Sequence, residues 1–238
     1  NRLEFRKALN LSVDMKAIAD TFYPPEVGSV WRGTPPWCAG SAGYDPALPS
    51  YPYDLEQAKQ LLRQAGYAGE AITFYSAPRP LNPEQREVDE AIASYWMKAG
   101  INVKLVPTDS SAINAKQNAS PQGFQPPAEM SVQPVYCRAS ILVALLRMIS
   151  RQAGGLLQNY WNQEKMDRYY SEVKGIVDPV ARDNRLREIN RELYQEYWTV
   201  PIVSRHMPIG FGPRVAASEY TPNQGTFIDL AWETLRPK

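Results

Sequence analysis

The side chains that most often carry out catalysis are few and scattered in this chain. It contains one histidine, His206, and no Gly-x-Ser-x-Gly elbow, phosphate-cradling loop or closely spaced cysteine pair. The acidic residues are spread over helix-forming stretches. A lone histidine offers no metal cluster, so His206 is either an isolated ligand or a surface or hinge residue. We therefore expect no catalytic site, no metal site and no cofactor.

The two cysteines, Cys38 and Cys137, have a spacing that fits neither a zinc pattern nor a Cys-x-x-Cys redox pair. In an oxidising compartment they could bridge, which would close a loop of about 100 residues and contribute roughly 4–5 kcal/mol in the chain-entropy model. Alternatively they are two separate buried thiols. The sequence leaves both alternatives open.

Length and charge exclude some classes of partner. The chain has 238 residues with 44% hydrophobic content, enough for one large domain with a substantial core. Its 26 basic and 25 acidic residues give a net charge of +1. Nucleic-acid binding would need a clustered basic face, so we expect no nucleic-acid partner. No stretch of apolar residues is long enough to predict a membrane span.

Aromatic residues are concentrated in a long predicted loop, residues 24–52, which is also rich in proline and glycine. A loop of this length is either functional or disordered, and its aromatic content favours order. Trp31 and Trp37 either anchor the loop on the domain or face a ligand. We keep both tryptophans as candidate ligand-binding residues, because loops on rigid scaffolds often carry binding residues.

The clearest local signal is an amphipathic helix that follows Asp54. Asp54 is a good N-cap, and Gly66 can adopt the left-handed conformation that closes a helix. Apolar residues recur between these two positions at helical spacing: Leu55, Ala58, Leu61, Leu62 and Ala65. The pattern therefore predicts both ends of this helix. A helix over residues 2–12 and a second one capped by Asp14 precede it.

A strand–helix–strand pattern follows and determines the predicted fold class. Residues 71–75 and 101–105 read as strands, and the helix between them is expected to open at Pro83 with Asn82 as its cap. Such a unit implies parallel pairing. Further along, the pattern predicts these elements: a strand at 130–136, a buried helix at 139–151, helices at 164–177 and 179–197, and a strand at 200–205. The chain is therefore predicted to be α/β, a mixed β-sheet flanked by helices.

Two later features complete the predicted organisation. The helix at 179–197 carries Asp183 and Arg187 at i,i+4 spacing, on a face that we expect to be solvated. The final segment has many glycines and prolines, few helix signals, and apolar residues around Phe227 and Trp232 that suggest one or two terminal strands. An unpaired strand of this kind would expose backbone groups and apolar side chains that can pair with another copy of the chain, so the segment predicts self-association.

Three segments carry a family resemblance. Residues 51–67 open with Tyr-Pro-Tyr-Asp, continue through Ala-Lys-x-Leu-Leu and end in Ala-Gly-Tyr. Residues 5–18 are similar to an Arg-x-Ala-Leu-x-x-Ala-Ile-Asp-Arg-x-x-Ile block, and residues 97–105 to a Gly-Ile-x-Val strand entry. In this order they resemble the extracytoplasmic solute-binding proteins of family 5, which serve peptide, opine and nickel ABC transporters.

The resemblance implies an architecture and a location. Residues 1–207 would form the second large lobe of a type II periplasmic-binding-protein fold, and residues 208–238 an extended C-terminal tail that returns to the sheet of the first lobe. That first, N-terminal lobe would be missing from this chain, as would the signal peptide. The resemblance also implies a periplasmic or extracytoplasmic location, ABC permease subunits as partners and a small-molecule or peptide ligand enclosed between two lobes.

The resemblance also suggests ligand-binding positions. Peptide-binding members have a Trp-Cys-Ala-Asp-like turn whose acid pairs with the amino group of the ligand, and Tyr136, Cys137, Arg138 and Ala139 match that turn. Ala139 replaces the acid, and leaving an ammonium group buried without it would cost several kcal/mol. The turn therefore favours an anionic or neutral ligand with Arg138 as its anchor; the alternative for Arg138 is a surface or inter-lobe salt bridge.

Taken together, the sequence predicts the substrate-binding component of an ABC importer and not an enzyme. Two rival functions stay open. One is an α/β enzyme domain whose active-site carboxylates cannot be recognised in a single sequence. The other is a sensor or chaperone that uses the same fold to hold peptides without transporting them.

Overall fold

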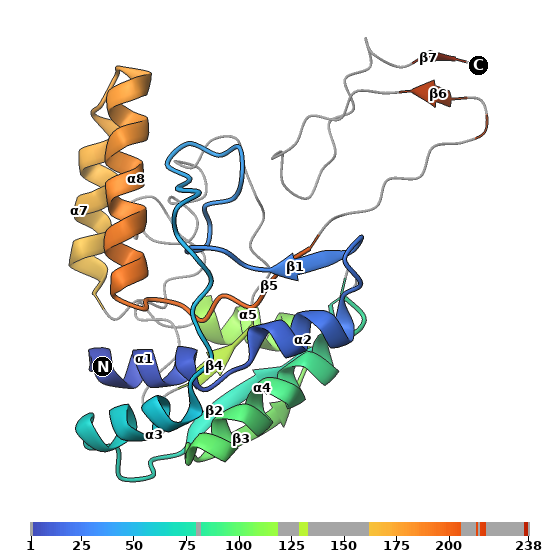
Figure 1. Cartoon of the computed structure of the whole chain (residues 1–238), viewed down its shortest axis with the longest axis vertical. Coiled ribbons are helices and arrows are strands. Elements are labelled where there is room, and N and C mark those ends of the chain that lie inside the picture. Colours follow the sequence, from blue (N-terminus) through green and yellow to red (C-terminus); the bar gives the residue numbers. More distant parts are fainter. Residues whose placement is uncertain are drawn as a thin grey trace.

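The structure is a computed structural model that describes residues 2–79, 82–118, 129–132 and 162–205, with short stretches at 213, 215–217 and 236–237. Figure 1 shows two parts, a small sheet with helices packed around it and a hairpin of two long helices standing away from that sheet. The helices are α1 (Leu3–Leu11), α2 (Met15–Phe22), α3 (Leu55–Gln64), α4 (Gln85–Ala99), α5 (Ser110–Asn118), α7 (Gln163–Lys174) and α8 (Pro179–Gln195).

The main sheet has three parallel strands in the order β3-β2-β4. These strands are β2 (Ile72–Ser76), β3 (Val103–Pro107) and β4 (Glu129–Ser131). Ile72 pairs with Val103, and Phe74 pairs with Met130 on the other side of the central strand. The predicted parallel pairing of the two strands around α4 is therefore confirmed, and the α/β fold class with it.

The first hydrophobic core lies between this sheet and the helices α1 to α4. It contains fully buried side chains from each of these elements, among them Leu9, Ile18, Leu62, Phe74 and Trp96. The rings of Phe74 and Trp96 are 5.2 Å apart, and the Trp96 indole N–H donates to the Leu9 carbonyl at 3.0 Å. These contacts lock α4 between β2 and α1.

Local capping interactions define most of the helix ends. The carboxylates of Asp14, Asp54 and Asp178 each accept a hydrogen bond from the backbone N–H three residues later, at 2.9, 2.8 and 2.7 Å. Gly66 and Gly100, which follow α3 and α4, have φ values of 63° and 96°. A left-handed conformation there costs glycine little, so the helices end where the sequence predicts.

The expected start of α4 at Pro83 is wrong. The helix begins at Gln85, and its N-cap residue Glu84 makes no side-chain capping bond. The Asn82 side chain, expected to cap backbone amides, donates instead to the Gln85 side chain at 2.6 Å. The Asn82 side chain is thus used in a side-chain contact, and the helix starts two residues later than predicted, at Gln85.

The segment expected to be one long loop, residues 24–52, contains a strand. β1 (Gly28–Val30) pairs antiparallel with β5 (Val203–Arg205), and Ser29 lies opposite Ser204. The Trp31 N–H extends the ribbon by donating to the Ile202 carbonyl at 3.3 Å. The partner strand is more than 170 positions away, so no local pattern could have indicated β1.

The second hydrophobic core joins the predicted loop to the α7–α8 hairpin. Trp37 is 1% exposed and packs in one cluster with side chains of both helices, among them Tyr169 and Leu186. The Asp183 face, expected to be solvated, helps to hold this loop. Asp183 pairs with Arg187 at 2.7 Å, as its spacing suggests, and its other oxygen accepts from the Gly43 N–H at 2.7 Å.

The remaining predictions fall partly outside the described residues. Cys38 is disulfide-bonded, and the other cysteine of the sequence, Cys137, lies outside them. So do the predicted helix at 139–151 and most of the final segment, where β6 (Val215–Ala217) pairs antiparallel with β7 (Arg236–Pro237). Among the helices that the structure describes, none combines the length and apolar character needed to cross a bilayer.

Candidate functional site

The topology of the main sheet points to its carboxyl edge. The chain leaves β2 through α4 and reaches β3 on one side, whereas β4 lies on the other side of β2. Strand β3 is thus added on one side of β2 and the next strand, β4, on the opposite side, so the strand order reverses at β2. In open α/β sheets, ligands bind outside the carboxyl ends of the strands at such a switch point. Here that edge is formed by the residues after Ser76 and after Ser131.

Arg79 spans this switch point. It lies three residues beyond the end of β2, and its guanidinium donates to the carbonyl of Val132, the residue that follows β4, at 3.2 Å. A guanidinium presents several donors in a planar fork that matches a carboxylate or a phosphate. Arg79 is therefore a cationic group of the right chemistry at the position where the sheet topology predicts a ligand.

A buried polar relay runs behind Arg79. The Tyr23 hydroxyl donates to Asn82 Oδ1 at 3.2 Å, Asn82 Nδ2 donates to Gln85 Oε1 at 2.6 Å, and Gln85 Nε2 donates to Asp89 Oδ1 at 2.7 Å. Gln85 and Asp89 are one helical turn apart on α4 and are 5% and 1% exposed. The relay connects the end of α2 with the inner face of α4.

The carboxyl group at the end of the relay has an unusual affinity for protons. Burial raises the pKa of Asp89 to about 6, because removal from water disfavours the charged form. Hydrogen bonds from Ser76 and Gln85 and the positive charge of Arg79 oppose that rise. Asp89 is thus linked to the end of β2 by a hydrogen bond from Ser76 and by the charge of Arg79.

The antiparallel ribbon reaches the same edge through Arg205 of β5. The guanidinium of Arg205 lies 3.4 Å from the Glu84 carboxylate and 5.5 Å from the centre of the Tyr23 ring. Burial also raises the pKa of Tyr23, so its hydroxyl stays a hydrogen-bond donor at neutral pH. The edge thus holds two arginines, one buried acid and one acid paired with Arg205.

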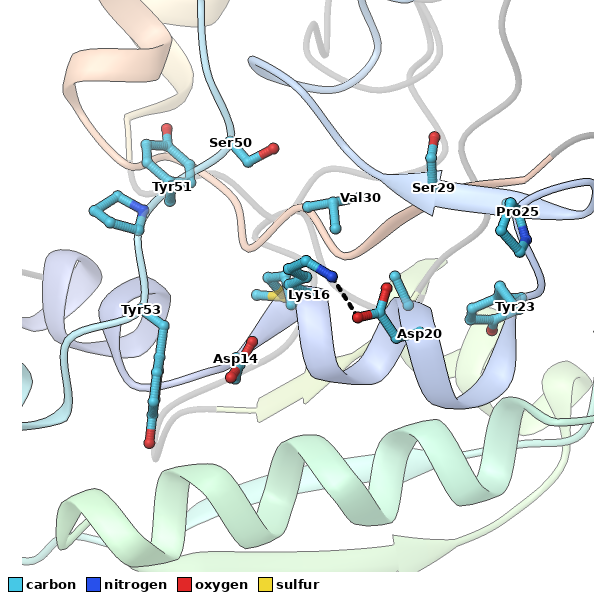
Figure 2. A pocket seen from close by; sticks show the side chains of 14 residues that line it. Asp14, Lys16, Asp20, Tyr23, Pro25, Ser29, Val30, Ser50, Tyr51 and Tyr53 are labelled. Atoms are coloured by element: carbon cyan, nitrogen blue, oxygen red, sulfur yellow. Dashed lines mark hydrogen bonds and ion pairs between the residues drawn. The ribbon is translucent and has the colours of Figure 1, made fainter.

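A cavity of about 740 Å³ lies next to this edge, between α2, β1 and residues 50–53. Figure 2 shows α2 forming its floor and β1 and Tyr51 its opposite side, with Tyr23 at one end. Lys16 and Asp20, on the floor, pair with each other and are mostly exposed. Asp14 already caps α2. Lys16 and Asp20 are therefore paired with each other, and Asp14 stabilises the start of α2. Tyr23 connects the cavity to the relay.

The tryptophans predicted as ligand-binding residues line neither the edge nor this cavity. Trp37 belongs to the second core, and Trp31, 7% exposed, follows β1. A direct ligand contact by either requires its packing to open, and their ligand role stays a prediction. The other candidates, Tyr136 to Ala139, lie outside the described residues; they begin four positions after Val132, beyond the carboxyl end of β4.

The sequence reasoning missed Arg79 and Asp89, although one signal was present. Asp89 is the only acidic residue on the buried face of α4, among Val88, Ile92 and Trp96. Burying an ionisable side chain costs free energy unless it is paired, so an acid on an apolar stripe marks a site worth attention. Arg79 carries no comparable local signal, because its position matters only once the strand order is known.

A comparison with protein-family models identifies the family of this chain. The model of the bacterial extracellular solute-binding proteins, family 5 Middle, matches residues 1–126, which is more than half of the chain. The chain belongs to this family. The resemblance seen in three sequence segments is therefore confirmed.

Individual relatives match only in part. Di/tripeptide-binding protein 1 of Pseudomonas aeruginosa is 36% identical over 111 residues, covering 44% of this chain and 20% of that protein. Heme-binding protein A of Haemophilus influenzae is also 36% identical over 111 residues, covering 44% of this chain and 19% of that protein. The matched region is thus about a fifth of the length of these curated relatives.

The structural comparison extends over nearly the whole chain. HbpA2 from Haemophilus parasuis superposes with a TM-score of 0.75 at 24% identity, over 99% of this chain and 45% of that one. The family 5 chain therefore has the type II periplasmic-binding-protein fold, as predicted. It spans less than half the length of this solved structure.

Proposed function

We propose that this chain supplies one lobe of the substrate-binding component of an ABC importer. The lobe would capture a small solute, such as a peptide, an opine or another amino-acid-derived or anionic compound, in a cleft closed by a second lobe. One observation carries the proposal: a member of a solute-binding family places Arg79 across the switch point of its sheet. The names of relatives that bind di- and tripeptides support the choice of solute class.

The charges at the sheet edge favour an anionic group on the solute. Glu84 and Arg205 offset each other's charge as an ion pair and Asp89 is buried behind Arg79, so the guanidinium of Arg79 is the cation proposed to meet the solute. A carboxylate such as the C-terminus of a peptide would fit the fork of Arg79. Arg138, in the segment that follows β4, is proposed as a second anchor, with Tyr136, Cys137 and Ala139 around it.

The proposal includes the wider organisation of the protein. Residues 1–207 would form the ligand-binding lobe, and residues 208–238 a tail that returns to the sheet of the N-terminal lobe. The protein would act in the periplasm or another extracytoplasmic space and deliver its solute to ABC permease subunits. Without the other lobe, the tail would promote self-association, which light scattering at high protein concentration can detect.

A binding role also accounts for the chemistry of the described residues better than catalysis does. Within residues 2–79, 82–118, 129–132 and 162–205, no group of three or more metal-ligating side chains is found. The carboxyl edge holds two arginines and two carboxyls, of which Glu84 pairs with Arg205 and Asp89 accepts hydrogen bonds from Ser76 and Gln85. A peptide-holding sensor or chaperone of the same fold remains the second candidate, since it would use the same residues.

Isothermal titration tests this proposal. In two-lobed binding proteins the ligand is buried between the lobes, so the 238-residue chain should release little heat with dialanine or trialanine. The full-length protein that contains it should bind at least one member of a panel of short peptides and opines. Submicromolar binding by the isolated chain, or no binding of any panel member by the full-length protein, would contradict the proposal.

The same measurement tests the anchor. Arg79→Gln in the full-length protein should weaken binding of a carboxylate-bearing solute roughly 10- to 100-fold, because a charge-assisted hydrogen bond contributes roughly 1.5–3 kcal/mol. Arg79→Lys is the matched control, since it keeps the charge and loses the fork. Unchanged affinity in Arg79→Gln would remove Arg79 from the site.

A further inference from the structure

Arg79 and Asn82 flank the turn between β2 and α4 and are linked by backbone contacts. Between the end of β2 and the start of α4, Arg79 and Asn82 form an isolated antiparallel bridge, and the Asn82 N–H donates to the Arg79 carbonyl at 2.9 Å. The helix that follows lacks a side-chain cap at Glu84. Asn82 therefore helps to fix the backbone at Arg79, whose guanidinium is also bonded to the Val132 carbonyl.

The side chain of Asn82 is fixed by the relay described above. Its amide group bonds to Gln85 at 2.6 Å and to Tyr23 at 3.2 Å, so Asn82 is attached to both α4 and the end of α2. Gln85 is in turn oriented by its 2.7 Å bond to Asp89. Each member of the relay thus fixes the next, from Asp89 inside the helix face to the turn at the sheet edge.

The charge of Asp89 determines the direction of the whole relay. An ionised carboxylate can only accept hydrogen bonds, so Gln85 must present its NH₂ group to Asp89 and its oxygen to Asn82. Asn82 must then present its NH₂ group to Gln85 and its oxygen to the Tyr23 hydroxyl. The observed donors all point toward Asp89, as this argument requires. Hydrogen bonds aligned in one direction reinforce one another.

We propose that Asp89 is a positioning residue for the solute site. Asp89 holds the turn of Arg79 through Gln85 and Asn82, and its charge attracts the Arg79 guanidinium toward the carboxyl edge of the sheet. The proposal rests on the function proposed for Arg79. It explains why an acid occupies the apolar face of α4, where an aliphatic side chain would pack without a desolvation cost.

The groups that face Asp89 come from three elements. Ser76 and Arg79 approach from the end of β2, Gln85 and the charge of Glu90 from α4 itself, and Tyr23 acts through Asn82 from the end of α2. Glu90 is exposed and raises the pKa of Asp89, whereas Arg79, Ser76 and Gln85 lower it. Protonation of Asp89 removes the attraction to Arg79 and so loosens the anchor.

Nuclear magnetic resonance of the Arg79 side chain tests the proposal without any ligand. The Nε–H signal of Arg79 in the 238-residue chain can be assigned by its loss in Arg79→Lys. Asp89→Asn should increase its hydrogen-exchange rate several-fold near neutral pH, because the guanidinium loses its charge partner. Glu90→Gln is the matched control, since it removes one negative charge from the exposed side of the same helix; it should leave the rate unchanged.

The pH profile identifies the cause. In the unmodified chain the Arg79 signal should shift with a midpoint near the Asp89 pKa of about 6. The step should be absent in Asp89→Asn and should move to higher pH in Gln85→Leu, which removes a bond that favours the charged carboxyl. Gln85→Leu also cuts the relay without changing charge and should itself speed exchange, so the test remains available if Asp89→Asn does not fold.

The exchange rates at Arg79 in these variants distinguish the proposal from its alternatives. Faster exchange at Arg79 in Asp89→Asn or Gln85→Leu, together with an unchanged rate in Glu90→Gln, supports the proposal. An Arg79 signal that keeps its exchange rate in Asp89→Asn and Gln85→Leu overturns it, as does an equal effect from Glu90→Gln or a pH step that persists in Asp89→Asn. Because no ligand is used, failure of the full-length protein to bind peptides would leave these results interpretable.

Discussion

The two hydrophobic cores of this chain are assembled in different ways. The first lies between the sheet and helices α1 to α4, and its buried residues all come from Ala8 to Ile101. The second joins the segment around Trp37 to the helices α7 and α8, more than 120 positions away. The buried residues of the first core therefore come from one continuous part of the chain, whereas in the second core Trp37 reaches the α7–α8 hairpin only after a long chain closure.

Polar contacts also connect distant segments in the second region. In the second region, loop and helix are joined by bonds from Asn190 Nδ2 to the Gly43 carbonyl at 3.1 Å and from Gly43 N–H to Asp183, and by an ion pair between Asp45 and Arg191. Tyr51 adds a hydrogen bond to the Tyr194 carbonyl at 2.6 Å. The part of the loop that follows β1, which has no helix or strand of its own, thus gains a fixed shape from a distant helix.

Removing Trp37 should have the largest effect on the second region. Trp37→Ala should lower the free energy of unfolding by about 3–5 kcal/mol, as expected for deleting a fully buried aromatic side chain. Urea denaturation measures this loss. Hydrogen exchange should accelerate in α7 and α8 while β2 and α4 stay protected. Phe74→Ala, in the first core, should give the reverse pattern; equal acceleration of both regions by both variants would show that the cores unfold as one unit.

Gly43 tests how tightly the loop approaches α8. In Gly43→Ala the new Cβ would lie 2.5 Å from Leu186 Cβ and 2.6 Å from Trp37 Nε1, at a φ of 78°. The strained backbone and the overlap together should cost roughly 2–5 kcal/mol in thermal or urea unfolding. Gly69→Ala is the matched control, because Gly69 has a φ of 96° with nothing within 4 Å of the added atom. A similar loss at both sites would mean that the close packing on α8 contributes little.

Two buried carboxyls, one in each region, should give opposite pH dependences. The pKa of Asp89 is raised to about 6 by burial, so the folded state binds its proton more tightly than the unfolded state. Its contribution to stability is complete below the unfolded pKa and is lost as pH rises through about 6. From the ordinary Asp value near 4, the loss amounts to about 3 kcal/mol. Asp89→Asn should abolish this fall, measured by urea unfolding across that range.

Asp45 provides the contrast. Burial alone would raise its pKa, but hydrogen bonds from Arg191 and from the Ala47 N–H lower it below the ordinary value. Its contribution is therefore present above the unfolded pKa and is lost as pH falls through the lower folded pKa. Asp45→Asn should flatten the acid side of the stability profile, whereas Asp89→Asn flattens the side near pH 6. The same pH dependence in both variants would contradict the assignment of the shifts.

The smallest expected effect is a local one that should be equal in both regions. Asp54→Ala and Asp178→Ala each remove the N-cap of a helix, α3 in the first region and α8 in the second. Each should cost about 1 kcal/mol in urea unfolding, because one backbone N–H loses its acceptor. Asp54→Ser and Asp178→Ser should restore most of the stability. A loss confined to one helix would show that capping, too, depends on the region.

This difference between the regions explains which features could be predicted from the sequence. The caps at Asp14 and Asp54, the helix-ending glycines and the parallel strand–helix–strand unit were all predicted, and the structure contains them. Two predictions that ignored the surrounding structure were wrong. Asn82 does not cap a backbone amide but bonds to the side chains of Gln85 and of Tyr23, which is 59 positions away. The face of Asp183 is not simply solvated, because Asp183 accepts from the Gly43 N–H. In both cases the side chain is used by a contact that the local pattern does not contain.

The sequence by itself determined the α/β class, several helix ends and the family, because capping bonds, apolar periodicity and family motifs lie within a few neighbouring residues. Only the tertiary structure decided that Arg79 reaches the carbonyl after β4, that hydrogen bonds connect Asp89 to Tyr23, and that Trp37 packs with α7 and α8. These contacts join segments up to about 150 positions apart. Their formation depends on strand order and chain closure, which local residue spacing does not specify.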